Sequence, residues 1–151
     1  MLIPRKVKHR KWHKGRSRNR LVETRGTTIA FGSHGIQALE PAWLNSKQIE
    51  SGRRAITRAL LREGKVWIRV FPDKPVTQKA AEVGMGKGKG TVDHYVFPVR
   101  PGRIIFEVGG ISEELAKKAL RSAKRKTLQN DLVRSKLRSS LKNLLKNRIV
   151  K

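Results

Sequence analysis

Residues 84–90 read Gly-Met-Gly-Lys-Gly-Lys-Gly, and this run limits what the chain can form more than any other feature. Alternating glycines are disfavoured inside a helix or strand, because glycine loses the most backbone freedom on folding. They suit a thin, extended finger that brings the backbone and two ammonium groups close to a partner. The whole sequence has 36 Lys and Arg against 11 Asp and Glu, a formal net charge of +25. A phosphate-rich partner is therefore expected, and RNA is the first choice.

The length and composition set further bounds. A chain of 151 residues suits one domain with tails. An anionic membrane surface is the second partner class that the charge allows, but it requires apolar anchors that are scarce here. The sequence has no cysteine, which excludes disulfides and thiolate metal sites. It has neither an apolar run of about 18 residues for a membrane span nor a signal-peptide core, so we expect a soluble protein of the bacterial cytoplasm or an organelle interior.

Residues 1–25 are interpreted as a basic arm. Residues 4–20 are dense in Lys and Arg and contain no acid, so we expect them to stay disordered until a counter-charge arrives. His9 and His13 have helical metal-ligand spacing, but no acid or cysteine accompanies them, and contact with RNA is the preferred interpretation. Trp12 has two interpretations of nearly equal weight: an apolar contact with the domain, or stacking on a base.

Residues 26–126 are expected to form an α+β domain, a sandwich of a mixed or antiparallel sheet with two main helices. Asn45 or Ser46 is placed to cap the first helix, Gly64 to end it in a left-handed conformation, and Ser112 to cap the second helix. Residues 65–71 are largely apolar on both faces, which predicts a central strand. A polar loop, residues 72–91, carries the finger. Further strands are expected at residues 27–31, 36–39, 92–99 and 103–108, with a break at 41–43 and a type II turn at 100–102.

Residues 127–151 predict a basic, amphipathic helical extension. Val133, Leu137, Leu141, Leu144 and Leu145 fall in helical register. Such a helix can dock on the domain, lie on a membrane, or lie along RNA with its apolar side against another protein. It lacks the Trp and Phe anchors of a membrane-surface helix, so no membrane partner is expected.

The glycine run does not match a nucleotide-binding loop. Counted from Gly84, both the P-loop and the dinucleotide patterns need a glycine where Lys89 stands. The acids have local structural uses, such as Glu113 and Glu114 at the start of a helix. Asp93 and His94 are neighbours that should face opposite ways on a strand. We therefore predict no catalytic residue, no metal site, no cofactor and no enzymatic activity.

Three arginines form a basic face on the first expected helix. Arg53, Arg54 and Arg58 lie within two turns, away from the apolar positions Ile49 and Ile56. A charge run is usually only a solvated helix face. Few acids are available to pair with these arginines, however, and guanidinium groups can hold phosphate through two hydrogen bonds. RNA contact is therefore favoured, and each neutralised phosphate should steepen the salt dependence of binding.

A set of motifs occurs in a distinctive order over about residues 1–123. The motifs are Pro4-Arg5-Lys6, Gln37-Ala38-Leu39-Glu40-Pro41-Ala42-Trp43, Gln48-Ile49-Glu50 followed by Arg53-Arg54-Ala55-Ile56-Thr57-Arg58, Trp67-Ile68-Arg69-Val70-Phe71-Pro72-Asp73-Lys74-Pro75-Val76-Thr77, Met85-Gly86-Lys87-Gly88-Lys89-Gly90, Pro101-Gly102-Arg103 and Gly110-Ile111-Ser112-Glu113-Glu114. Each is modest alone. Their ordered set closely resembles the family of bacterial large-subunit ribosomal protein sixteen, including its organellar members.

The resemblance implies an α+β, RNA-binding ribosomal protein near the base of the central protuberance of the large subunit. It implies binding to large-subunit ribosomal RNA (rRNA) and help in holding transfer RNA (tRNA) in the aminoacyl site during translation. Neighbouring ribosomal proteins would be further partners, and a homo-oligomer is not expected. The finger residues that would reach toward tRNA and the peptidyl-transferase region are Met85, Gly86, Lys87, Gly88, Lys89 and Gly90. The residues that would anchor rRNA are Arg5, Lys6, Lys8, Arg10, Lys11, Trp12, His13, Lys14, Arg16, Arg53, Arg54, Arg58 and Lys74.

Two features depart from the family pattern. The family usually has Arg immediately before the Met-Gly-Lys-Gly-Lys-Gly run, a site of hydroxylation in some bacteria, whereas this chain has Gly84. That modification is therefore excluded here, and one finger charge is lost. Members typically end soon after the helix that follows Ser112, whereas this chain continues to Lys151. A free-standing nucleic-acid chaperone is the alternative function that the charge allows.

Overall fold

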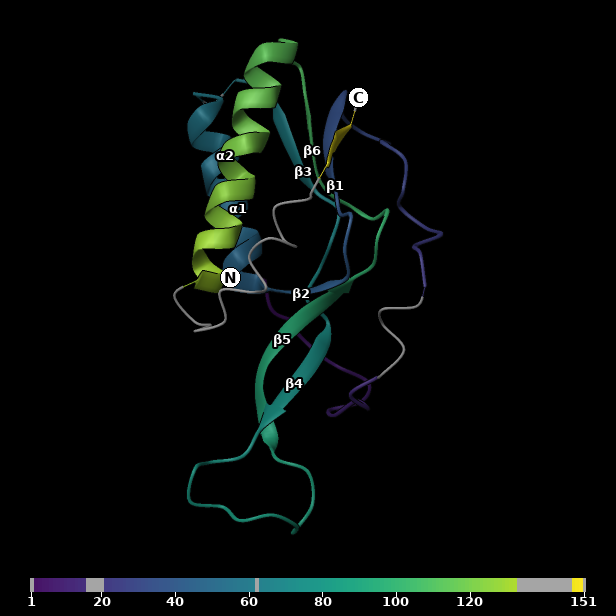
Figure 1. Ribbon diagram of the computed structural model, residues 1–151, viewed down its shortest axis with the longest axis vertical. Coiled ribbons are helices and arrows are strands. Elements are labelled where there is room, and N and C mark those ends of the chain that lie inside the picture. Colours follow the sequence, from purple (N-terminus) through teal and green to yellow (C-terminus); the bar gives the residue numbers. More distant parts are fainter. Residues whose placement is uncertain (1, 16–20, 62, 133–147, 151) are drawn as a thin grey trace.

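The computed structural model describes residues 2–15, 21–61, 63–132 and 148–150. Helices and strands alternate irregularly along the chain, and the fold is α+β as predicted (Figure 1). The elements are β1 (His34–Gln37), β2 (Ala42–Asn45), α1 (Ser46–Ala59), β3 (Lys65–Ile68), β4 (Lys74–Gln78), β5 (Thr91–Val99), β6 (Ile104–Gly109), α2 (Glu113–Leu132) and β7 (Arg148–Val150).

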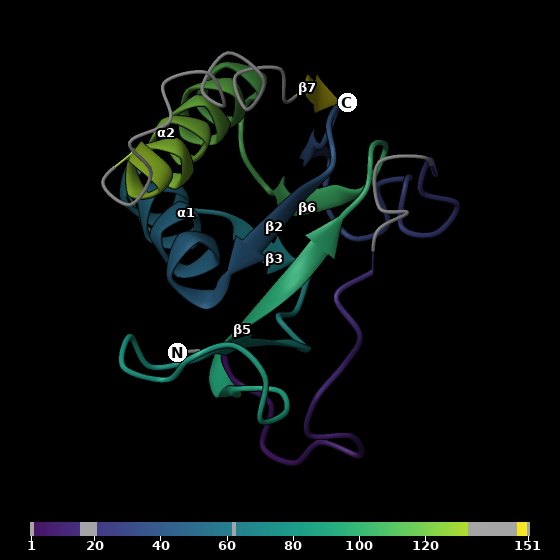
Figure 2. The same cartoon turned by 60° about the horizontal axis from the view of Figure 1, so that its bottom comes forward.

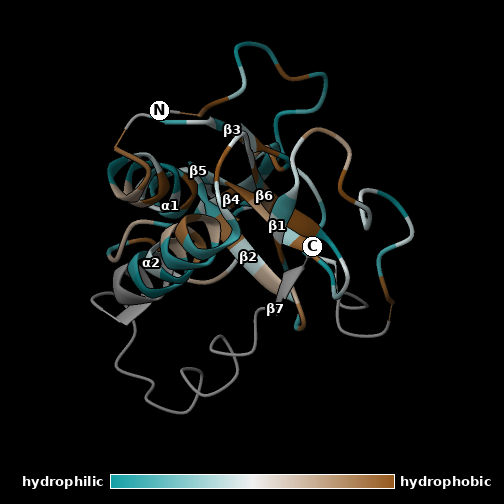
Figure 3. Ribbon diagram, turned by 90° about the horizontal axis from the view of Figure 1, so that it is seen from above, coloured by the Kyte–Doolittle hydropathy of each residue, from teal (hydrophilic) through white to brown (hydrophobic). Residues whose placement is uncertain are grey.

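The described strands form two antiparallel sheets. One has the order β3-β6-β1-β7 and the other β2-β5-β4. Helices α1 and α2 lie side by side next to the first sheet, as Figure 2 shows. Both helices carry hydrophilic and hydrophobic residues on different sides (Figure 3). Their apolar sides meet β1 and β6 in a core whose buried members include Ile36, Ile49, Ile56, Leu60, Phe106, Val108, Ala116, Ala119, Leu120 and Ala123.

Helix α1 begins as predicted and ends earlier than predicted. The Asn45 side chain accepts a hydrogen bond from the Gln48 N–H at 2.8 Å, and the Gln48 side chain accepts one from the Asn45 N–H at 2.8 Å. This reciprocal capping box satisfies two N–H groups at the helix start. The helix ends at Ala59, and Leu61 is already left-handed with φ 50°. Gly64 is also left-handed, with φ 70°, but it leads into β3 instead of ending the helix.

The predicted strand at residues 27–31 is absent from the described structure. The backbone N–H groups of Ala30, Phe31 and Gly32 instead bond to the buried carboxylate of Glu107 on β6. The strand expected at residues 36–39 lies at 34–37 as β1. The segment 65–71 was predicted to be a central strand, which is wrong: β3 ends at Ile68, and β6 is its one partner among the described strands. Its second apolar face is explained by Trp67, whose ring stacks on Phe31 at 6.2 Å.

The region predicted as one polar loop begins with a strand. Strand β4 occupies residues 74–78 and pairs with β5, so the loop that carries the finger spans only residues 79–90. The predicted break at 41–43 is also wrong, because β2 starts at Ala42 and pairs with β5. The turn at 100–102 is present, with the Arg103 N–H donating to the Arg100 carbonyl at 3.2 Å and Gly102 at φ 93°. This turn joins strands of two different sheets, because β5 pairs with β2 and β4, whereas β6 pairs with β1 and β3.

The C-terminal segment differs in part from the predicted helical extension. Helix α2 continues without a break from Glu113 through Thr127 to Leu132, and Ala116, Ala119, Leu120 and Ala123 form its buried stripe. Residues 133–147 lie outside the described structure. Residues 148–150 form β7 alongside β1, so the helical prediction is wrong for them. Among the described helices, none combines the length and apolar character required to cross a membrane.

Candidate RNA-binding surfaces

The finger stands at the end of a two-stranded hairpin. Strands β4 and β5 carry residues 79–90 away from the two helices, to the far end of the molecule (Figure 1). Met85 is fully exposed, and a Cβ added at Gly84, Gly86 or Gly88 would meet nothing within 4 Å. Lys87, Gly86 and Gly88 all have positive φ. The run therefore offers bare backbone and exposed lysines, as the sequence predicted, and the paired strands provide its base.

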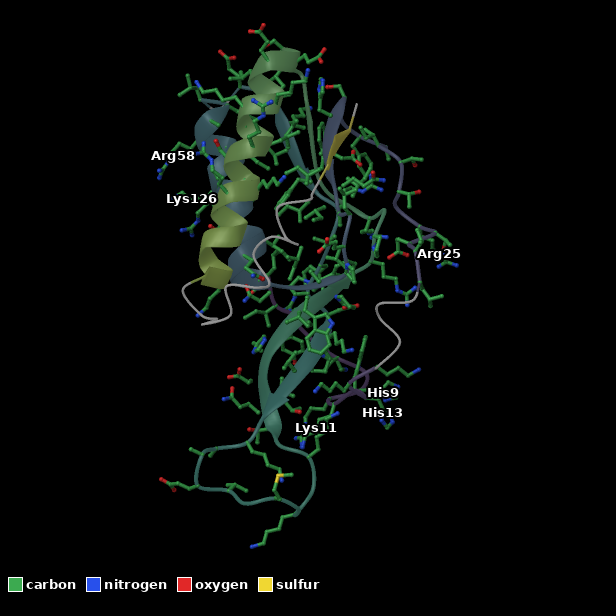
Figure 4. All side chains as sticks on the ribbon, in the orientation of Figure 1. His9, Lys11, His13, Arg25, Arg58 and Lys126 are labelled. Atoms are coloured by element: carbon green, nitrogen blue, oxygen red, sulfur yellow. The ribbon has the colours of Figure 1, made fainter. Side chains whose placement is uncertain are left out.

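The basic arm lies against this hairpin. Lys11 Nζ donates to the Lys89 carbonyl at 2.8 Å, and Lys89 Nζ donates back to the carbonyl of Trp12. Lys74 Nζ donates to the carbonyl of Lys14 at 2.7 Å. In Figure 4 the labelled arm residues His9, Lys11 and His13 lie beside the hairpin. Backbone carbonyls of the arm and the finger thus accept hydrogen bonds from lysine ammonium groups in this arrangement. That the arm orders only when a counter-charge arrives stays a prediction. The sequence gives no periodic signal for such pairing.

The individual arm residues predicted to contact RNA are mostly accessible. Trp12 is 41% exposed, Lys11 is half-buried, and Arg16 lies outside the described structure. Lys74 is also half-buried, with its ammonium group 4.8 Å from the centroid of the Trp43 ring. A cation over an indole face is held by the ring quadrupole, so Lys74 belongs to the junction of arm and hairpin. The exposed members are Arg5, Lys6, Lys8, Arg10, His13 and Lys14.

The arginine face of α1 is partly neutralised. Glu50 accepts from Arg53 at 2.5 and 2.9 Å and from Arg54 at 3.1 Å. The hydrogen bonds from Arg53, reinforced by Arg54, lower the pKa of Glu50 to about 2. The prediction that few acids could pair with these arginines therefore missed Glu50, which lies one helical turn away. Two arginines share one carboxylate, and the cluster with exposed Arg58 keeps a positive charge.

A cleft beside this face collects further cations. It has a volume of about 450 Å³ and is lined by Lys47, Arg54 and Arg58 of α1, by Glu50, and by Lys126 of α2. Figure 4 shows Arg58 and Lys126 on the two neighbouring helices. Lys126 was not among the predicted RNA contacts, because the sequence did not reveal that α2 packs alongside α1. Four basic groups against one acid make this cleft attractive to phosphate.

One buried acid of the domain, Glu107 on β6, has a structural use. Glu107 is fully buried, accepts from the N–H groups of Phe31 and Gly32 at 2.8 and 3.0 Å, and pairs with Arg69. Burial alone would raise the pKa of Glu107, but these hydrogen bonds and the Arg69 charge lower it. Its oxygens therefore tie the loop at residues 30–32 to β6.

One histidine–carboxylate pair was not foreseen. His94 Nδ1 lies 2.7 Å from Asp93 Oδ2, although both side chains are largely exposed. The prediction that these neighbours face opposite ways is wrong, because the β4–β5 register shifts between Val76 and Thr77. Such a bulge turns two successive side chains toward one side. Within the described residues, no group of three or more His, Cys, Asp or Glu side chains is arranged to hold a metal ion.

The comparison with protein families agrees with this geometry. A family model described as "Ribosomal protein L16p/L10e" matches residues 4–128, which include the arm, the finger, α1 and most of α2. The last 23 residues, 129–151, lie beyond the match. A match over most of the chain, on top of the basic arm, the exposed finger and the cationic helix face, places this protein in the L16p/L10e family of ribosomal proteins, structural constituents of the large subunit that bind RNA in translation.

Proposed function

We propose that this protein anchors itself to large-subunit rRNA through its arm and α1 face and helps position tRNA at the aminoacyl site through its finger. The observation that carries the proposal is the finger itself, an exposed glycine–lysine run at the end of a hairpin that leads away from the core. The folded body does not need this run for its own packing. An external partner is the physical reason for keeping it extended.

The finger suits an RNA backbone in two ways. Its glycines carry no Cβ, so a phosphate or ribose can approach the chain closely. Lys87 has an exposed side chain at the finger's tip, where it adds a compact positive charge for a phosphate oxygen. Gly84, next to Met85, removes the further charge that the family usually has at this position, so binding at the tip depends more heavily on Lys87.

The arm and the α1 face suit anchoring to a larger RNA. The exposed cations of the arm and those around Arg58 lie on separate parts of the molecule (Figure 4). Several phosphates contacted at once release several counterions, and the affinity then falls steeply with added salt. An anchor of this type is strong only when both surfaces are engaged.

The test separates anchoring from tRNA positioning. Cell extract is sedimented through a sucrose gradient in about 0.5 M salt, where weak electrostatic binding is largely lost, and the large-subunit fraction is probed for this chain. Retention is expected. Release to the top of the gradient would overturn anchoring and favour the free nucleic-acid chaperone.

Ribosomes carrying Lys87→Gln then test the finger. We expect unchanged retention but a several-fold weaker affinity for tRNA at the aminoacyl site, because one phosphate contact is lost. Lys117→Gln is the matched control, since it removes the same charge on α2, where Lys117 pairs with Glu113 at 2.7 Å. Equal tRNA affinities for the two variants would overturn the role of the finger.

A further inference from the structure

A small cavity lies where the arm meets the β-hairpin. Its volume is about 240 Å³, and its walls include Trp12 and Lys14 of the arm, Trp43 of β2, Lys74 of β4, and Lys89 of the finger. This volume is below the roughly 300–1,000 Å³ of drug-sized ligand pockets. It therefore suits a single flat ring system better than an extended ligand. Neither the arm nor the hairpin forms this cavity alone.

The chemistry of the walls is aromatic and cationic. The indole rings of Trp12 and Trp43 supply the aromatic surface, and Lys74 Nζ lies 4.8 Å from the Trp43 centroid. Every described residue that lines the cavity is neutral or basic. An ammonium group has three N–H donors. Lys89 Nζ uses one of them for the Trp12 carbonyl, so its other N–H groups can donate to a phosphate oxygen. The same walls disfavour a metal cation.

We infer that this cavity is a binding pocket for one unpaired nucleobase, with tryptophan walls for the base and lysines for its phosphate. The inference rests on the proposed RNA-binding function and adds the class of ligand and the residues that take it. A nucleotide in a single strand combines a flat π-surface with an adjacent negative charge, which matches both kinds of wall. An acidic peptide would use the lysines but would leave the two indoles without a purpose.

Binding at this pocket would also fasten the arm to the finger. Lys11 donates to the Lys89 carbonyl at 2.8 Å, while Lys89 donates to the arm at Trp12. Lys74 makes a third bond, to Lys14. These bonds hold the wall that Trp12 belongs to. A base inserted between arm and hairpin, with its phosphate on the same lysines, would offset the repulsion among them and stabilise this arrangement.

Tryptophan fluorescence of the full chain tests the pocket. The sequence has three tryptophans, so Trp67→Phe gives a background in which emission comes only from Trp12 and Trp43. The probes are a short single-stranded oligoadenylate and inorganic polyphosphate of similar total charge. Oligoadenylate is expected to quench the emission through stacking, and polyphosphate is expected to bind without comparable quenching.

Substitution of Trp12 makes the test quantitative. In the Trp67→Phe background, Trp12→Leu is expected to weaken oligoadenylate binding by about 5- to 150-fold, the range for one stacked base, while polyphosphate binding stays unchanged. Trp12→Phe should restore most of the affinity, because it keeps an aromatic face. Trp12 is 41% exposed, so the thermal midpoint of unfolding should be nearly the same for all three proteins and serves as the folding control.

Two results would overturn the pocket. One is unchanged oligoadenylate affinity in Trp12→Leu; the other is equal quenching by polyphosphate, which would mark a general polyanion surface. In either case, steeply salt-dependent binding to RNA would leave the proposed anchoring intact. Salt-insensitive or absent binding to every RNA tested would instead overturn the anchoring proposal itself.

Discussion

Two regions of this protein are each stabilised by a different force: the body, formed by the two helices and the sheet that they pack on, and the opposite end, where the arm meets the finger. In the body, Ile56, Val108 and Leu120 have no exposed surface, and burial of apolar side chains is the stabilising force. At the other end Met85 is fully exposed, and the contacts between arm and finger are bonds from lysine ammonium groups to backbone carbonyls. The lysine ammonium groups at this end can therefore exchange their bonds to backbone carbonyls for bonds to RNA phosphates, while the body stays folded.

Truncation of one side chain in the core and one in the finger should show the largest difference in stability between the two regions. Ile56→Ala removes a fully buried side chain of α1 from the hydrophobic core and is expected to lower the free energy of unfolding by about 2–5 kcal/mol. Met85→Ala removes a fully exposed side chain and should change it by less than about 0.5 kcal/mol. Urea unfolding of both variants measures the difference. Comparable losses would mean that the finger packs on the body.

The buried carboxylate of Glu107 is the next largest test, because it is a polar tie inside the body. Glu107→Gln keeps one accepting oxygen but loses the charge that meets Arg69 and the N–H groups of residues 30–32. We expect a loss of about 1–3 kcal/mol. The pKa of Glu107 in the folded protein is lowered from its ordinary value of 4.5. Its contribution is therefore fully present above that value and lost as the pH falls through the folded pKa.

Unfolding measured from neutral pH down to about pH 3 checks this linkage. The stability difference between the natural protein and Glu107→Gln should shrink as the solution becomes acidic. A difference that stays constant with pH would mean that the Glu107 carboxyl has the same pKa in the folded and the unfolded protein, and a difference that grows in acid would mean that folding raises its pKa. Asp93→Asn is the control, since the Asp93 side chain is 49% exposed and should affect stability much less.

Glycines of the two regions provide a third test. Gly64 has φ 70°, and a Cβ there would lie 2.6 Å from the Gly109 carbonyl oxygen, so Gly64→Ala combines a left-handed conformation, about 1–2 kcal/mol, with a clash. Gly86 has φ 88° but open space around it, so Gly86→Ala should strain only the finger locally and leave unfolding of the body unchanged. Thermal unfolding of the two variants checks this. A larger shift for Gly86→Ala would contradict the division into two regions.

The same division explains what the sequence could predict. The apolar spacing in α1 follows from local periodicity and the cap at its start from residue type, and both are confirmed, with Asn45 as the capping residue. The finger's exposure follows from its glycines. The edge position of β3, the β4 strand and the arm's contact with Lys89 depend on long-range pairing, for which a single sequence carries no periodic signal. Lys126 was missed for the same reason, since only the packing of α2 on α1 brings it to the cleft.

The smallest expected effect on stability is at Glu50, a residue at which one substitution tests both stability and RNA binding. Its hydrogen bonds with Arg53 and Arg54 lie at the surface, and such pairs contribute at most about 1 kcal/mol. Glu50→Gln is therefore expected to change the free energy of unfolding only slightly at neutral pH. Because the folded pKa of Glu50 is about 2, this small contribution is present above the ordinary pKa and disappears as the pH falls toward 2.

The same substitution should strengthen RNA binding, because removal of the Glu50 carboxylate from the cleft frees two guanidinium groups for phosphate. Titration of large-subunit rRNA at several salt concentrations should give tighter binding and a steeper salt slope for Glu50→Gln. A weaker affinity would show that Glu50 holds the arginines in the orientation that RNA requires.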